Sequence, residues 1–186
     1  GKHAAKEKNN LQLRRDSDLS IKFSGLITKK ILSNELIKSF ALPKKIHGTI
    51  FSKSTSGMKY GRHIDNAYMS SGRADLSFTV FLNCKKKYEG GALSIQGLNS
   101  EEKFKLDAGE IIIYPSTYLH SVEKVIDGER LVFIGWIESY VKSIEEREYL
   151  FDLDAAARSL LAKYGRSEEV DLIYKSYSNF LRRLGN

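Results

Sequence analysis

Hydrophobic and polar positions follow three successive patterns along the chain. Up to Ser20 the residues are polar and basic, which predicts extended or frayed backbone. Between Thr28 and Phe40 apolar residues recur at helical spacing, behind a threonine that can cap the first turn. Pro43 disfavours helix at the residue before it. The first pattern therefore predicts one N-terminal helix at residues 28–40.

From Gly48 to Tyr140 the pattern changes to short runs of β-branched and aromatic residues. Turn signals such as Glu89-Gly90-Gly91 and Asp127-Gly128 separate these runs. The expected strands are Thr49–Lys53, Leu76–Asn83, Ala92–Gln96, Lys103–Leu106, Glu110–Tyr114, His120–Val125 and Arg130–Glu138. Many short strands at this spacing predict a sandwich, jelly roll or barrel.

After Tyr140 helical spacing returns. Asp154–Lys163 is rich in alanine and leucine, and Ser167–Arg183 carries an apolar face. A membrane anchor or a coiled coil is conceivable, but a helix pair packed on the β core is favoured. We therefore expect a mainly β fold with flanking helices, divided into a core domain at 1–142 with an N-terminal helix and a helical extension at 143–186.

Composition narrows the class of protein. The chain has 186 residues, 41% of them apolar and 28% charged, as in an ordinary globular domain. Its longest apolar stretch, from Leu131 to Ile137, is too short to cross a bilayer. The single cysteine, Cys84, cannot form an internal disulfide, and no export signal opens the sequence. These features predict a cytoplasmic protein.

The net charge of +7 is unevenly distributed. Residues 1–62 carry 14 Lys/Arg against 4 Asp/Glu, whereas residues 63–186 carry 16 against 19. A basic segment can face nucleic acid or another acidic partner. The lysines are scattered and no aromatic residues alternate with them as a stacking platform, so a solvated surface is favoured.

Three side chains in the strand-rich region suit a metal. His63 and Asp65 are two residues apart, so in an extended strand they point to the same face. His120 follows in another expected strand. Two imidazoles and one carboxylate form the facial triad of non-haem Fe(II) enzymes, which leaves positions open for O2. Each residue alone also fits a structural role, such as a core histidine bonded to backbone.

Arg130 opens the last expected strand, ten residues after His120. If it points inward, its guanidinium needs an anion, because an unpaired buried charge is costly. An internal Asp or Glu is one possible partner. A dicarboxylate co-substrate, held by two parallel hydrogen bonds, is the other.

The motifs around these residues resemble a known family. In order they are YGRHIDNAYM, RADLSFTVFLN, YEGGALSIQ, KLDAGEIIIYPSTYLHSVEKVIDGERLVFIGWIESYV and REYLFDLDAAARSLL. Together they resemble the PKHD-type hydroxylases, of the prolyl/lysyl-hydroxylase-like branch of the Fe(II)/2-oxoglutarate-dependent dioxygenases. The likeness runs over nearly the whole chain.

The resemblance implies a double-stranded β-helix, or jelly roll, with Fe(II) held by His63, Asp65 and His120. It implies that Arg130 binds the distal carboxylate of 2-oxoglutarate. Such an enzyme hydroxylates a substrate and releases succinate and CO2, with L-ascorbate as the expected reductant. The substrate is a peptide or protein side chain or a small metabolite.

The chain departs from the family pattern at two positions. Ser54 stands where the family usually has a tyrosine that can bond the co-substrate, and Tyr60 is a conceivable substitute. Phe81 stands where some relatives have a tyrosine that assists the arginine, and Thr79 lies on the same strand face. Asn66 and Arg73 are candidates for orienting the ligands, although Arg73 could instead pair with Asp75.

Two other functions stay open at this stage. One is a nucleic-acid-directed oxygenase of the same superfamily, suggested by the basic first third. The other is a jelly-roll module that binds iron or 2-oxoglutarate without catalysis. Oligomeric state is not encoded in any pattern of the sequence.

Overall fold

The computed structural model describes residues 9–97 and 99–186. Contacts between Cα atoms group the chain into two compact units. The first contains Ile46–Glu138 and the chain up to Ile27, and the second contains Thr28–Lys45 and Ser139–Asn186. The expected boundary at residue 142 stays a prediction about domains. We describe each unit by itself.

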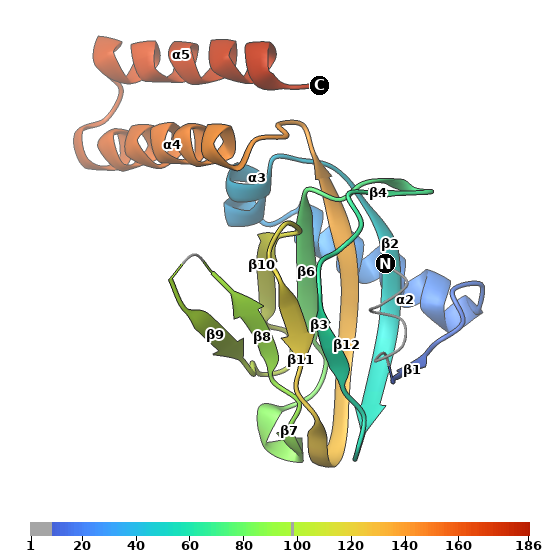
Figure 1. Ribbon diagram of the computed structural model, residues 1–186. Helices are drawn as coiled ribbons and strands as arrows, with labels where there is room; N and C mark the ends of the chain where they lie inside the picture. The colour runs from blue at the N-terminus through green and yellow to red at the C-terminus, as the bar shows by residue number, and fades with distance from the viewer. Residues whose placement is uncertain (1–8, 98) are drawn as a thin grey trace. The chain divides into compact units, whose positions relative to one another are not determined.

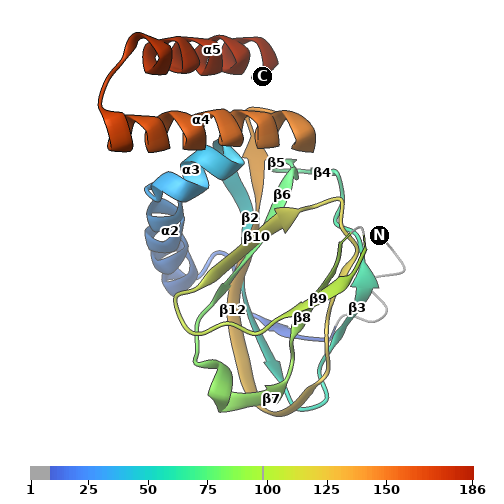
Figure 2. The ribbon, with the colours of Figure 1, turned by 90° about the vertical axis from the view of Figure 1, so that its left-hand side faces the viewer.

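The first unit is built on two β-sheets, which Figures 1 and 2 show on opposite sides of its interior. The larger sheet has the order β1-β2-β12-β6-β10, with β7 paired to β12. Its strands are β1 (Leu11–Gln12), β2 (Pro43–Thr55), β12 (Val125–Ser139), β6 (Leu76–Phe81), β10 (Ile111–Pro115) and β7 (Tyr88–Gly90). The smaller sheet has the order β3-β11-β8-β9, from β3 (Tyr60–His63), β11 (His120–Val122), β8 (Leu93–Gln96) and β9 (Glu101–Phe104).

This architecture confirms the expected jelly-roll class. Strand β6 is buried along its whole length between β10 and β12. Its residue Phe78 and Phe133 of β12 are almost fully buried, with ring centroids 5.9 Å apart. Alternate side chains of a strand face opposite sides, so Phe133 packs away from the side chains of Val132 and Ile134, which line the interior cavity described below.

A short hairpin, β4 (Tyr68–Met69) with β5 (Gly72–Arg73), follows the first expected ligands. His47 of β2 fixes it through two contacts: Nδ1 with Ser71 Oγ at 2.8 Å and Nε2 with the Arg73 carbonyl oxygen at 2.8 Å. A 3-10 helix, η1 (Lys85–Lys87), precedes β7. His47 therefore has a structural role in the hairpin.

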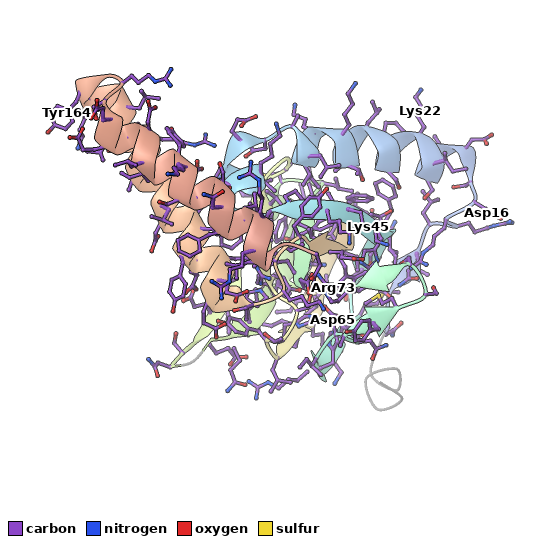
Figure 3. All side chains as sticks on the ribbon, turned by 90° about the horizontal axis from the view of Figure 1, so that it is seen from above. Asp16, Lys22, Lys45, Asp65, Arg73 and Tyr164 are labelled. Atoms are coloured by element: carbon purple, nitrogen blue, oxygen red, sulfur yellow. The ribbon has the colours of Figure 1, made fainter. Side chains whose placement is uncertain are left out.

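The second unit is helical. It contains α3 (Glu35–Ala41), α4 (Ile144–Tyr164) and α5 (Glu168–Leu184), and α2 (Asp18–Leu32) ends inside it. Leu42, Val141 and Leu150 form its buried cluster, against which side chains of α5 pack. Figure 3 shows Tyr164 projecting outward at the end of α4. None of the helices in the described part of the chain combines the length and apolar character needed to cross a membrane.

The prediction of one helix at residues 28–40 is wrong. The chain forms α2 from Asp18, whose carboxylate suits the N-terminal end of the helix dipole, and α2 stops at Leu32. A second helix begins after Asn34, whose side chain accepts a hydrogen bond from the Ile37 amide at 3.1 Å. The apolar spacing therefore continues past Asn34, which caps a second helix, and spacing alone did not show the break between the two helices.

Other expected boundaries also shift. Strand β2 begins at Pro43, because the first residue of a strand tolerates a missing N–H. Strand β12 continues through the expected turn at Asp127-Gly128, where its register against β7 is irregular. Helix α4 begins at Ile144 behind the Ser143 cap, ten residues before the expected start, whereas α5 matches its prediction.

Candidate metal and co-substrate site

Two histidines meet across neighbouring strands of the smaller sheet. His63 ends β3 and His120 begins β11, and the two are directly opposite in the antiparallel register. Their ring centroids are 4.2 Å apart, and both residues are buried. The pairing of β3 with β11 therefore brings the two imidazoles together, although 56 residues separate them in the sequence.

Asp65 completes a cluster with these rings. Its Oδ1 lies 3.9 Å from His63 Nε2, and its Oδ2 lies 3.7 Å from His120 Nε2. One ligand atom from each of the three residues lies within 4.8 Å of the others. The strand ends at His63, so Asp65 comes from the loop that follows, and Ile64 between them is half exposed.

Backbone carbonyls set the orientation of both imidazoles. His63 Nδ1 lies 2.9 Å from the Gly61 carbonyl oxygen, and His120 Nδ1 lies 3.0 Å from that of Tyr118. A carbonyl only accepts, so each Nδ1 carries the proton and donates. Each Nε2 lies on the side of Asp65. In the neutral tautomer with the proton on Nδ1, the Nε2 lone pair is free to bind a metal ion.

A pair of buried serines holds the carboxylate. Ser77 of β6 donates a hydrogen bond to Asp65 Oδ2 at 2.6 Å. Ser77 Oγ also lies 2.8 Å from Ser116 Oγ, and both serines are 3% exposed. This contact joins the larger sheet to the loop that carries Asp65. The donor set of two imidazoles and one restrained carboxylate fits Fe(II).

Two tyrosines flank the histidine rings. Tyr60 stacks on His63 with centroids 3.8 Å apart, and Tyr114 lies edge-on to His120 at 5.1 Å. Burial, and then the Asp65 charge, raise the pKa of both tyrosines above the usual value. Both hydroxyls therefore stay protonated over the physiological range.

Arg130 is buried without a carboxylate partner. It is 3% exposed, and within residues 9–97 and 99–186 no acidic oxygen lies within ion-pair distance of it. Its Nε has no hydrogen-bond acceptor there, and the Tyr88 hydroxyl beside it is likewise unbonded. Burial lowers the pKa of the guanidinium, although an arginine keeps its charge.

The packing around Arg130 is close. Its guanidinium carbon lies 5.6 Å from the centroid of the Phe81 ring. A Cβ on Gly91, which has φ +64°, would lie 3.2 Å from Arg130 Cδ and 3.3 Å from the Tyr88 ring. Glycine therefore lets the backbone cover both side chains, and neighbours from three segments restrict the arginine.

The cluster and Arg130 line one cavity of about 110 Å³. Ser77, Thr79 and Tyr114 form part of its wall, together with Val132, Ile134 and Trp136 of β12. The Trp136 indole N–H has no hydrogen-bond partner in the described part of the chain. One wall thus combines apolar side chains with a few polar groups, as small-molecule sites do.

The structure settles several expected side-chain positions. Ser54, Tyr60 and Thr79 line the cavity, whereas Asn66 is exposed. Arg73 pairs with Asp75, with Nε 2.7 Å from Oδ1, and is not among the residues that line the cavity. In Figure 3 Asp65 and Arg73 are both labelled and belong to the first unit.

Three residues of the site were not expected from the sequence: Ser77, Ser116 and Tyr114. Serine and tyrosine have no spacing signature, because their contacts with Asp65 and the cavity depend on strand register. The run of alternating residues in the β6 segment was the only available signal, since it places Ser77 and Thr79 on one face.

A jelly roll with two histidines, an aspartate and a buried arginine around one cavity defines a class of oxygenase. The family model described as the 2OG-Fe(II) oxygenase superfamily matches residues 49–138. A second model, the PKHD-type hydroxylase C-terminal domain, matches residues 145–185. Both matches fall within the described part of the chain, apart from residue 98.

Relatives narrow the class further. A PKHD-type hydroxylase of Prochlorococcus marinus strain MIT 9215 is 77% identical over 185 residues, covering all of this chain and 84% of the relative. A PKHD-type hydroxylase of strain MIT 9211 is 57% identical, with the same coverage. The chain belongs to the PKHD-type hydroxylase family.

Solved structures share the fold at low identity. A prolyl-4-hydroxylase of Pseudomonas putida has a TM-score of 0.52 and 19% identity, over 74% of this chain and 80% of that one. A prolyl hydroxylase of Trichoplax adhaerens, in complex with a hypoxia inducible factor peptide fragment, has a TM-score of 0.50 and 16% identity, over 76% and 64%. These likenesses confirm the jelly-roll fold.

Family membership also confirms the predicted activity. The protein is an Fe(II)- and 2-oxoglutarate-dependent dioxygenase that hydroxylates a substrate with release of succinate and CO2. Its substrate is unidentified. The family thereby favours catalysis over the alternative of a non-catalytic binding module.

Proposed function

We propose that His63, Asp65 and His120 hold the Fe(II), and that Arg130 binds the distal carboxylate of 2-oxoglutarate. One observation carries the proposal: three ligand atoms lie within 4.8 Å of one another in a cavity that also contains a buried guanidinium without a counterion. A keto diacid has one end that can bind the metal held by the three ligands and another end that can pair with the Arg130 guanidinium. Its distal carboxylate neutralises Arg130, and its keto-acid end suits a metal with open positions.

The metal supplies the capacity to bind and activate O2 when it is bound. The chain supplies orientation. The carbonyls of Gly61 and Tyr118 keep both Nε2 atoms aimed at the metal position, and Ser77 keeps one carboxylate oxygen occupied. Arg130 fixes the far end of the diacid, so its reactive end stays in one place.

We propose L-ascorbate as the reductant that keeps the iron ferrous, and the cytoplasm as the location, because both follow from the family resemblance and the cysteine usage. The substrate is a peptide or protein side chain or a small metabolite.

Substitution of the ligands tests the metal site. His63→Ala or Asp65→Ala should reduce Co(II) affinity, measured by calorimetry without O2, by at least about tenfold, because a ligand is lost. His47→Ala is the matched control, since His47 is buried in the same unit but bonds the β4–β5 hairpin. Unchanged metal affinity in the His63 and Asp65 variants, with folding intact by circular dichroism, would refute the assignment.

Arg130→Lys tests the co-substrate site. We expect 2-oxoglutarate binding to weaken roughly tenfold or more while metal affinity is kept, because lysine cannot reproduce the two-point contact of a guanidinium. Arg73→Lys serves as control, because Arg73 pairs with Asp75 outside the cavity lining. Equal loss of 2-oxoglutarate affinity in both variants would argue against a specific role for Arg130.

A further inference from the structure

Tyr114 presents a hydroxyl to the cavity. This hydroxyl has no role in the proposed metal site or in the proposed contact of Arg130. Tyr114 lies on β10, opposite Ser77 in the register with β6. Its ring packs with Leu93 and Ile95 and lies edge-on to His120. The residue is 7% exposed and lines the cavity. Packing therefore fixes the ring and leaves the hydroxyl confined to the site.

This hydroxyl forms no hydrogen bond within residues 9–97 and 99–186. A hydroxyl that faces a cavity without a protein partner is available to water or to a ligand. Asp65 and Arg130, which come from opposite ends of the proposed site, line the same cavity as Tyr114. The hydroxyl thus lies within reach of the space between the metal ligands and the arginine.

Arg130 alone does not satisfy a carboxylate. A carboxylate offers about four acceptor positions, and a bidentate guanidinium uses two of them. The ring of Phe81 next to Arg130 has no donor, and Ser54 carries only a short side chain. The Tyr88 hydroxyl lies beside Arg130, but Tyr88 does not line the cavity. A tyrosine hydroxyl carries a proton at neutral pH, so the Tyr114 hydroxyl can donate to an anion.

We propose that the Tyr114 hydroxyl donates a hydrogen bond to the distal carboxylate of 2-oxoglutarate, beside Arg130. This inference rests on the proposed function of the same cavity. It places the second anchor of the co-substrate on β10, not at Ser54 or Phe81, where the family pattern would have placed a tyrosine. The hydroxyl therefore comes from a different strand from either of those two positions.

The test is binding of two keto acids to Co(II)-loaded protein without O2, measured by calorimetry. Tyr114→Phe should weaken 2-oxoglutarate binding roughly 10- to 100-fold, as for loss of a hydrogen bond to a charged group. Binding of 2-oxobutyrate, which has the same metal-binding end but no distal carboxylate, should stay unchanged in that variant. Co(II) affinity should also stay unchanged.

Ile112→Val is the control for packing. Ile112 packs against the same cluster as Tyr114 but does not line the cavity. This variant should bind both keto acids like the unmodified protein. A comparable loss in Ile112→Val would show that the effect is general loosening of the cluster, and would overturn the inference.

The outcomes separate this inference from the proposed function. If the unmodified protein does not bind 2-oxoglutarate, the proposed function fails. If it binds and Tyr114→Phe binds equally well, or loses both keto acids to the same extent, only the role of Tyr114 in holding the distal carboxylate fails. Selective loss of the dicarboxylate supports it.

Discussion

Ser77 acts on the proposed iron site through a single oxygen of Asp65. Its hydroxyl donates to Oδ2, and Ser116 lies behind it at hydrogen-bond distance. With Oδ2 occupied by this hydrogen bond, Oδ1 is the oxygen of Asp65 that would be left for a metal ion. A hydroxyl serves this purpose better than a cation, because it orients the carboxylate without neutralising its charge.

Ser77→Ala should therefore weaken Co(II) binding about tenfold without unfolding the protein, because a carboxylate that is not oriented must be ordered by the metal itself. The measurement is calorimetry with a thermal melt in parallel. Ser94→Ala is the control, since Ser94 is equally buried on β8 but donates to Glu101. Metal affinity that falls equally in both variants would contradict a specific role for Ser77.

Residue types and spacing were sufficient to predict His63, Asp65, His120 and Arg130 as the candidate site. The structure brings the first three together and buries the fourth without a counterion. Ser77 and Tyr114 were not predictable, since neither type is specific and each reaches the cavity only through the register of β6 with β10. Long-range pairing is not visible in local patterns.

At the scale of elements, the antiparallel pairing of β7 with β12 positions the backbone next to Arg130. Gly128 of β12 pairs with Tyr88 of β7 and has φ +78°. A Cβ at Gly128 would lie 2.2 Å from the Lys87 carbonyl oxygen. Backbone would have to move to make room, and Tyr88, which packs beside Arg130, would move with it.

Gly128→Ala should consequently destabilise the protein by more than the 1–2 kcal/mol, roughly, that positive φ alone costs a non-glycine residue. It should also weaken 2-oxoglutarate binding. Gly109→Ala isolates the cost of positive φ, because Gly109 has φ +90° and nothing lies within 4 Å of an added Cβ. Urea unfolding compares the two, and equal losses of unfolding free energy would rule out the steric effect.

Element boundaries were less predictable than element types. Helix α5 matched because its apolar face is uninterrupted and Ser167 caps it, with its side chain accepting from the Val170 amide. The N-terminal helix did not match, because apolar spacing alone does not show that Asn34 caps a new helix. Strand β12 begins at Val125, before the predicted start at Arg130, because its pairing with β7 includes Gly128.

At the scale of the whole molecule, an unpaired buried cation makes folding and ligand binding interdependent. Desolvation of Arg130 lowers the stability of the free protein, and an anion that binds the folded state restores it. Stabilisation by a ligand present at 100 times its Kd is about 2.7 kcal/mol. Binding of the co-substrate should therefore also stabilise the folded protein.

Arg130→Met should raise the stability of the ligand-free protein by on the order of 1 kcal/mol, because an apolar side chain of similar length replaces a desolvated charge. The same substitution should abolish the rise in melting temperature that 2-oxoglutarate causes in the unmodified protein. Thermal unfolding with and without 2-oxoglutarate checks both effects. A less stable variant that still responds to 2-oxoglutarate would contradict this account.

The backbone carbonyls that fix His63 and His120 have one more consequence. Imidazoles held by backbone carbonyls would present the same two donor atoms to any divalent ion. Copper and zinc bind such donors more tightly than ferrous iron does. At the proposed site, cellular metal supply would therefore contribute to which ion is bound, and excess zinc would inhibit the enzyme without altering its amount.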